Sequence, residues 1–427
     1  MLRTLLLLFM TIRSMLLKTE SQPAILLFLI IFFCFGIAIA YLTPYGEFPD
    51  ERSHLQYVRY IDQHHELPKL SYNLSEIPST VAFHPPLYYI VAAILIQQSS
   101  APEMQMLILR IFSVFQGLAA VFILWKCANL VFPGNRAAAV LTMAVTVFNP
   151  QFIFIHSGAG NIPMTTLTCA FVALCLIKIM TRPTNLMRSS VLLGIALGLA
   201  LLSRTVTVYI VPPSLIVLFL KAKDRKQSFY LAATLTICTT IVAGWWYIGN
   251  WIQYGDPILW KVGSATVGAY AIKQGDVFEW MFLFELLAFL HASFWAYFGR
   301  NEYHGEIWQY AIYLFLELSA VLGIYEIWRK NGHDADFQSP AFERPAFFIM
   351  LLAGSIAILE LLITLMKIRS GQGRYLYMTI VPLALGLGAG LVKILPQAWR
   401  MRGAIIGSVF LFMFQIYLLI RYWLPHV

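Results

Sequence analysis

Charged residues are scarce in this chain of 427 residues. They make up 12% of the sequence, whereas a soluble globular protein carries about 25%, and hydrophobic residues reach 59%. Apolar runs of roughly 18 residues or more are typical of transmembrane helices, and the chain has many of them. Lipid offers the backbone no hydrogen bonds, so such runs must be helical. The composition excludes a soluble globular protein and predicts an all-α polytopic membrane protein.

Cysteine is rare as well, with five residues in the whole chain. All five lie in or at the ends of apolar runs and show no paired spacing: Cys34, Cys127, Cys169, Cys175 and Cys238. This pattern favours free thiols over a disulfide framework or a cysteine metal site.

Acidic residues are outnumbered by basic ones, 21 to 30, which gives a net charge of +9. The excess does not indicate a nucleic-acid partner, because the basic residues stand in short clusters between apolar runs. That distribution follows the positive-inside rule for cytoplasmic loops, and basic clusters beside a membrane also favour anionic lipid. We expect membrane lipid as a partner and no nucleic acid.

The apolar runs predict a bundle of about eleven transmembrane helices. Residues 1–22 have an apolar core too short to span, and we expect them to form a helix on the cytoplasmic face, with a retained signal-anchor as the alternative. Residues 23–427 are expected to form a single transmembrane domain. The expected spans are 23–42, 105–125, 137–155, 162–180, 189–203, 205–220, 229–247, 307–328, 345–366, 376–396 and 403–421.

Residues 279–298, "EWMFLFELLAFLHASFWAYF", fit two interpretations. They are apolar enough to span, but they carry Glu279, Glu285 and His291, and we expect a re-entrant or interfacial helix on the outer side. Basic clusters such as "KAKDRK" then lie inside, the N-terminus is cytoplasmic, and residues 44–104 form a long first extracytoplasmic loop. We expect a multi-pass protein of the inner or plasma membrane.

The first outer loop opens with an acidic pair, in "GEFPDERSHLQYVRYIDQHH" (residues 46–65). Proline at the first helical position and acids in the first turn suit a helix start, so a helix is expected from Pro49 onward. Helical spacing places Asp50, His54 and Tyr57 on one face, which predicts an amphipathic helix lying on the membrane surface. Taken alone, the acidic pair has a purely structural explanation, the stabilisation of a helix N-terminus.

Four further segments give this helix a context. They are "FHPPLYYIVAAIL" (83–95), "LGIALGLALLSRT" (193–205), "GWWYIGNWIQYGDP" (244–257) and "KIRSGQGRYLYMTIVPLALG" (367–386). Together with the acidic pair, they make the chain resemble the polyprenyl-phosphate-sugar-dependent glycosyltransferases of the GT-C superfamily, which include the protein O-mannosyltransferases and the lipid A aminoarabinose transferases. Those families have an Asp-Glu pair in the first outer loop and a Pro-Pro-Leu-Tyr-Tyr segment later in that loop. The resemblance covers most of the chain and implies a GT-C-like bundle.

The resemblance implies an enzyme that moves a sugar from a polyprenyl-phosphate carrier to an acceptor on the extracytoplasmic face. The acceptor, a lipid, a polysaccharide or a secreted protein, attacks the anomeric carbon, and polyprenyl phosphate leaves. Asp50 and Glu51 are the implied catalytic residues, with Asp50 as general base and with Glu51 and His54 orienting it or binding the acceptor. A positioned base typically contributes about 10²–10⁴-fold.

The departing phosphate needs preorganised cations, and Lys367, Arg369 and Arg374 cluster at the expected outer mouth of two late spans. The planar guanidinium matches phosphate oxygens, and Tyr375 is expected to pack on the sugar or the lipid. Arg204 lies in a short apolar turn and is a further candidate. For all of these cations, and for Arg110, the alternative is simple snorkelling to the interface.

The sequence departs from the superfamily pattern in the next outer loop. GT-C enzymes commonly carry a second acid there, but this loop reads "HSGAGNIP", with His156 or Asn161 in its place. Because that acid helps to hold a divalent metal in some relatives, we expect metal-independent chemistry and no cofactor, with a divalent metal as the less favoured alternative. His84 is a candidate contact for the donor phosphate or a metal, although a lone histidine more often has neither role.

Two other function classes remain open. A transporter or lipid flippase should show broken helices in two matching halves, which the sequence lacks. A polysaccharide or O-antigen ligase, polymerase or other assembly protein could share the same architecture. Substitution of Asp50 by asparagine separates them, because only an enzyme should lose sugar transfer while remaining folded.

Overall fold

The computed structural model describes residues 22–71, 78–182, 185–261, 263–264, 280–329, 334–368 and 371–427. In these ranges the regular structure is helical except for one two-stranded antiparallel hairpin. The predicted all-α membrane fold is confirmed. Almost all of the segment 1–22, predicted to be an interfacial helix, lies outside the described residues.

The elements follow one another as α2 (Gln22–Leu42), α3 (Glu51–His64), α4 (Leu87–Ile96), α5 (Pro102–Val131), α6 (Arg136–Val147), α7 (Pro150–Ile155), α8 (Ile162–Thr181), α9 (Leu186–Ser203), η2 (Thr205–Ile210), α10 (Val211–Lys221), α11 (Arg225–Thr239), η3 (Thr240–Gly244), α12 (Trp245–Tyr254), α14 (Trp280–Trp295), β1 (Tyr297–Phe298), β2 (Tyr303–His304), α15 (Ile307–Arg329), η4 (Ala335–Phe337), α16 (Arg344–Ile368), η5 (Gly373–Thr379), α17 (Ile380–Lys393), η6 (Gln397–Trp399), α18 (Arg400–Leu418), η7 (Leu419–Trp423) and η8 (Leu424–His426).

Nine helical segments of the described chain are long and apolar enough to cross a membrane, which makes it a multi-pass membrane protein. They coincide with nine of the expected spans. The other two expected spans, 137–155 and 205–220, are built from shorter apolar helices. Residues 280–295 also form a short apolar helix, α14, which packs against α7, α15 and η5.

The expected span 137–155 is broken between α6 and α7. Its break has a local cause: the Asn149 side chain accepts a hydrogen bond from the Phe152 backbone N–H at 2.8 Å, and Pro150 occupies the first turn of α7. Asparagine followed by proline is a helix-start signal, and proline cannot continue the hydrogen-bonding pattern of the preceding helix. Hydropathy alone concealed this break.

The expected span 229–247 is longer than predicted. Helix α11 continues through one π-helical segment, η3, into α12 and ends only at Gly255, whose φ is +65°. The tryptophan- and tyrosine-rich stretch that follows the expected span is therefore the last part of one helical segment, residues 225–254.

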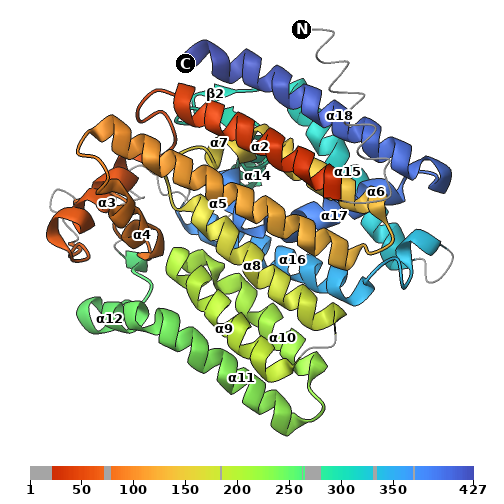
Figure 1. The fold of residues 1–427 in the computed structure, drawn as a ribbon, viewed down its shortest axis with the longest axis horizontal. Coiled ribbons are helices and arrows are strands. Elements are labelled where there is room, and N and C mark those ends of the chain that lie inside the picture. Colours follow the sequence, from red (N-terminus) through yellow and green to blue (C-terminus); the bar gives the residue numbers. More distant parts are fainter. Residues whose placement is uncertain are drawn as a thin grey trace.

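The helices α2, α5, α8, α9 and α11 lie in a row, and α3 and α4 cover one end of it (Figure 1). We call this end the α3/α4 end. The most enclosed segments are α8 and η5–α17, with 72% and 78% of their most apolar windows buried. Helices α17 and α15 approach each other closely at Gly390. A Cβ added to Gly390 would lie 2.2 Å from the Ala320 carbonyl oxygen. Small residues are what permit such close contacts between membrane helices.

The apolar face of helix α3, predicted to lie against the membrane surface, packs on protein. Its Leu55, Tyr57 and Val58 side chains are buried in a cluster formed with α4, α5 and α8. Tyr57 stacks on Tyr89 of α4 with ring centroids 3.9 Å apart. The apolar face of α3 thus packs on protein, and this packing fixes the position of the residues at its N-terminus.

Candidate active site

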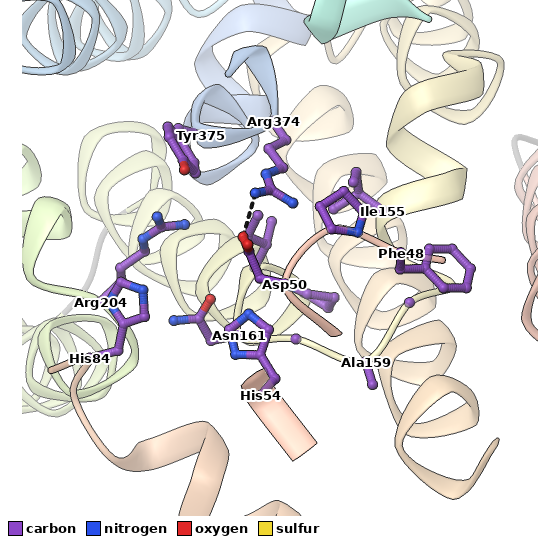
Figure 2. A pocket seen from close by; sticks show the side chains of 15 residues that line it. Phe48, Asp50, His54, His84, Ile155, Ala159, Asn161, Arg204, Arg374 and Tyr375 are labelled. Carbon is purple, nitrogen blue, oxygen red and sulfur yellow. Dashed lines mark hydrogen bonds and ion pairs between the residues drawn. The ribbon is translucent and has the colours of Figure 1, made fainter. Parts of the chain in front are cut away.

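A small pocket lies at the α3/α4 end, where loops from distant parts of the chain meet (Figure 2). Its volume is about 50 Å³, and it is lined by Phe48, Pro49, Asp50, His54, His84, Ile155, Gly158, Ala159, Gly160, Asn161, Ile162, Pro163, Arg204, Arg374 and Tyr375. Sites for small ligands usually measure about 300–1,000 Å³. The pocket is therefore much smaller than such a site.

An ion pair lies in the wall of the pocket. Arg374 Nη2 donates to Asp50 Oδ2 at 2.6 Å, between residues 324 positions apart in the sequence (Figure 2). The Asp50 side chain faces the cavity and keeps 52% of its surface accessible, whereas that of Arg374 keeps 5%. The Arg374 Nε–H has no hydrogen-bond partner. The arrangement holds a cation ready for an anion at the pocket wall.

Arg374 is held by contacts between η5 and α14. The Gly373 N–H donates to Ser293 Oγ at 2.7 Å, and the Tyr377 hydroxyl donates to the Phe294 carbonyl at 2.7 Å. A Cβ on Gly373 would lie 2.2 Å from the Phe294 backbone nitrogen. Only glycine permits this approach, so the residue before Arg374 fixes where the arginine enters the pocket.

The position of Asp50 is fixed by the contacts of the next residue, Glu51. Glu51 points away from the pocket, and its buried carboxylate accepts four hydrogen bonds: from Arg110 Nε and Nη2 at 2.8 Å each, and from the Gly46 and Ala159 backbone N–H groups at 3.1 Å each. Asp50 itself adopts a left-handed conformation with φ at +60°, which aspartate and asparagine tolerate better than most residues. Glu51, expected as a catalytic residue, does not line the pocket.

The alternative that Arg110 simply snorkels toward the interface is wrong. Arg110 is buried, 5% exposed, and donates to the carbonyls of Ala40, Thr43 and Pro44 as well as to Glu51. The hydrogen bonds of the Arg110 guanidinium therefore attach the loop after α2 to α5. A buried ion pair needs such additional hydrogen bonds to offset the loss of water.

The electrostatic surroundings of Asp50 favour its charged form. Enclosure in the pocket raises the pKa of the Asp50 carboxyl, but the nearby Arg374 cation outweighs it, so the pKa is lowered below its usual value. A neighbouring carboxylate raises the pKa of an acid when its own charge is not compensated. The neighbour, Glu51, is neutralised by Arg110.

The two histidines of the pocket are held in their neutral form. Burial lowers the pKa of His54 to about 4 and lowers that of His84 well below its usual value. His54 Nδ1 and the Tyr89 hydroxyl share a hydrogen bond at 2.9 Å. At neutral pH both rings offer a hydrogen-bond donor and an acceptor without adding charge.

Arg204 and Tyr375 complete the wall of the pocket. Arg204 follows the last residue of α9, and its guanidinium carbon lies 4.5 Å from the centre of the Tyr375 ring, within cation–π distance. Arg204 lines the pocket rather than snorkelling away from it. The pocket thus contains two guanidinium groups and one carboxylate among the described residues.

The structure brings together six of the nine residues expected to form the site: Asp50, His54, His84, Arg204, Arg374 and Tyr375. Glu51 supports the pocket from behind. Lys367 lies in the last turn of α16, but its side chain is not described, and Arg369 lies outside the described residues.

Sequence reasoning did not count Asn161 among the site residues, although its loop was noted for lacking an acid. Asn161 is buried, 1% exposed, and lines the pocket. His156, the other residue of that loop considered in place of the acid, is buried away from it, with Nδ1 2.7 Å from the Phe152 carbonyl. The two glycines of "HSGAGN", Gly158 and Gly160, were the available signal, since a Cβ on Gly160 would lie 3.2 Å from the His54 ring.

The described residues offer few side chains that could act together as metal ligands. Among the described residues, no three His, Cys, Asp or Glu side chains are grouped closely enough to hold one. All five cysteines are free thiols.

Comparisons with known proteins support the resemblance that the motifs suggested. The family model described as dolichyl-phosphate-mannose-protein mannosyltransferase matches residues 83–248. These residues include His84 and Asn161, and they end within α12. No curated protein matches the chain.

Solved structures of membrane glycosyltransferases share the fold. ArnT from Cupriavidus metallidurans bound to undecaprenyl phosphate is 17% identical, with a TM-score of 0.55 over 89% of this chain and 61% of that one. AglB from Archaeoglobus fulgidus, an archaeal oligosaccharyltransferase in complex with an inhibitory peptide and a dolichol-phosphate, is 13% identical, with a TM-score of 0.53 over 94% and 56%. The arabinofuranosyltransferase AftD from Mycobacteria is 13% identical, with a TM-score of 0.51 over 93% and 27%. The expected GT-C-like fold is confirmed, and the chain spans about three fifths of the length of ArnT.

Proposed function

We propose that this protein is an integral-membrane glycosyltransferase that moves a sugar from a polyprenyl-phosphate carrier to an acceptor on the extracytoplasmic face of the cell membrane. The observation that carries the proposal is the 2.6 Å pair of Asp50 and Arg374 in a pocket that also contains Arg204. Base and phosphate-binding cations are the two groups that the reaction requires. The acceptor is a lipid, a polysaccharide or a secreted protein.

In the proposed reaction, Asp50 takes the proton of the acceptor's hydroxyl or amine as that group attacks the anomeric carbon. Arg374 and Arg204 bind the phosphate and stabilise its negative charge as the glycosidic bond breaks. Tyr375, stacked on Arg204, holds that guanidinium in place. Glu51 acts as a positioning residue through Arg110, and no step requires a metal.

The donor must open the Asp50–Arg374 pair before it can react. In a direct displacement the attacking and leaving groups stand on opposite faces of the sugar, and carboxylates that act across a sugar in this way are roughly 6.5–9.5 Å apart. Asp50 and Arg374 are in contact at 2.6 Å, and the pocket volume of about 50 Å³ is too small for a sugar. The donor phosphate therefore replaces Asp50 on Arg374 and releases the carboxylate to act as a base.

The test is transfer by the purified full-length protein in lipid nanodiscs. Undecaprenyl phosphate carrying a radiolabelled hexose or pentose is added, and the release of undecaprenyl phosphate is followed with lipid, polysaccharide and peptide acceptors. Release that depends on Asp50 supports the proposal. A wild-type protein that releases nothing from any of these donors, yet carries them across the membrane of a proteoliposome, would establish the transporter alternative.

A further inference from the structure

Asn161 differs from the other asparagines that begin helices. Four asparagines are N-caps in the described residues, at the starts of α6, α7, α8 and α9. The side chains of Asn135, Asn149 and Asn185 each accept a backbone hydrogen bond from their own helix, which is the usual role of an N-cap asparagine. The side chain of Asn161 does not cap α8. Its amide is therefore available for another purpose.

The side-chain amide nitrogen of Asn161 is buried without a hydrogen-bond partner, which costs folding free energy. The residue is 1% exposed, and its Nδ2 atom is buried without a hydrogen-bond partner. Buried polar groups are almost always hydrogen-bonded, and an exception requires an explanation. Figure 2 shows the amide among Asp50, His54 and Arg204, which line the same pocket. A ligand in the pocket would supply the missing partner.

The chemistry of the neighbours indicates which part of a ligand this is. Two guanidinium groups suit the phosphate, and the Asp50 carboxylate suits the acceptor proton. A neutral amide suits an uncharged partner with both a donor and an acceptor, and a sugar hydroxyl has both, so it can pair with either end of the amide.

We infer that Asn161 hydrogen-bonds a hydroxyl of the donor sugar and is a determinant of sugar selectivity. This inference rests on the proposed function. A site built to pair with one hydroxyl discriminates strongly against a sugar that lacks or inverts it, because the buried polar group is then left unpaired.

The test measures binding without acceptor, in the full-length protein in nanodiscs. The probes are undecaprenyl phosphate and its glucose, galactose and mannose derivatives; galactose and mannose each differ from glucose at a single hydroxyl position. Wild-type protein is expected to bind one sugar derivative preferentially. Asn161→Ala is expected to reduce that preference about tenfold, within a range of roughly 5- to 100-fold, and to leave the affinity for undecaprenyl phosphate unchanged. Asn161→Ser, which keeps a short hydroxyl, should retain part of the preference.

Thermal unfolding distinguishes recognition from a structural role. Asn161→Ala removes an amide without a capping bond, so its Tm should be equal to or above that of the wild type. The matched control is Asn135→Ala, at the start of α6, which removes an amide that caps its helix and also donates to the Asp336 carbonyl at 3.0 Å. This control should lower the Tm and keep the sugar preference.

The outcomes separate the two proposals. Equal sugar preferences in wild type and Asn161→Ala, or a Tm loss together with weaker binding of undecaprenyl phosphate, would overturn the role of Asn161. A wild type with no sugar preference would overturn it too. Selective, Asn161-dependent binding without any transfer would support this inference and overturn the proposed function.

Discussion

Replacing Asp50 with asparagine should abolish transfer and yet tighten the binding of polyprenyl phosphate. Asparagine has nearly the same shape as aspartate and also tolerates the left-handed conformation that Asp50 adopts, with φ at +60°. The substitution therefore removes the charge without disturbing the backbone. The base is lost, and the competitor for Arg374 is lost with it.

The magnitudes of the two effects differ. Loss of a positioned base lowers kcat by about 10²–10⁴-fold. The ion pair that the phosphate no longer has to displace is half open to solvent on the Asp50 side, with 52% of that side chain accessible, so its contribution must be discounted for screening to about 1 kcal/mol. That energy corresponds to about fivefold tighter binding of undecaprenyl phosphate.

The assay is equilibrium binding of undecaprenyl phosphate to protein in nanodiscs, in parallel with transfer of a labelled sugar. Asp62→Asn is the matched control, because it removes the same charge from the same helix but lies in a different surface groove, beside Gln105. The control should leave both measurements unchanged. Weaker binding in Asp50→Asn than in the wild type would refute the competition for Arg374, and retained transfer would refute the base.

Three further predictions follow from the same geometry. Arg374→Lys keeps the charge but loses the planar guanidinium group, so undecaprenyl phosphate should bind about tenfold more weakly. Arg374→Ala should weaken this binding further. Unchanged binding in both variants would exclude a phosphate contact. Glu51→Gln leaves the buried Arg110 without its ion-pair partner, which should cost about 3–5 kcal/mol of stability and lower the Tm measured in detergent. The control, Glu66→Gln, changes an exposed residue and should change stability by no more than about 0.5 kcal/mol. In the ligand-free protein the Arg374 cation lowers the pKa of the Asp50 carboxyl. The acid limb of kcat/KM should therefore lie below the usual range of an aspartate, and the acid limb of kcat should lie at higher pH because the donor phosphate occupies Arg374.

The sequence predicted most of the spans because lipid leaves the backbone one local solution. A segment that enters the membrane must satisfy its own hydrogen bonds as a helix, so composition alone places α2, α5, α8 and α16. Local chemistry also explains the failures. The break before α7 follows from Asn149 and Pro150, two residues that a hydropathy profile averages away.

The pocket was only partly accessible from the sequence. Asp50 and Arg374 were selected through motifs in different loops, but their 2.6 Å contact joins positions 324 residues apart, and no local pattern encodes such a distance. The pairing of Glu51 with Arg110 was not predicted for the same reason: the sequence does not show whether a charged residue contacts a substrate or another charged residue.

What the sequence determined by itself is the membrane-spanning helical architecture and the kinds of side chain available at one end of it, since both depend on local hydropathy and residue chemistry. The tertiary structure alone decided which charges pair, which face of α3 is buried and which asparagine has an unpaired amide. These depend on helix packing, where a shift of a few ångströms determines whether a polar group faces protein, lipid or a cavity.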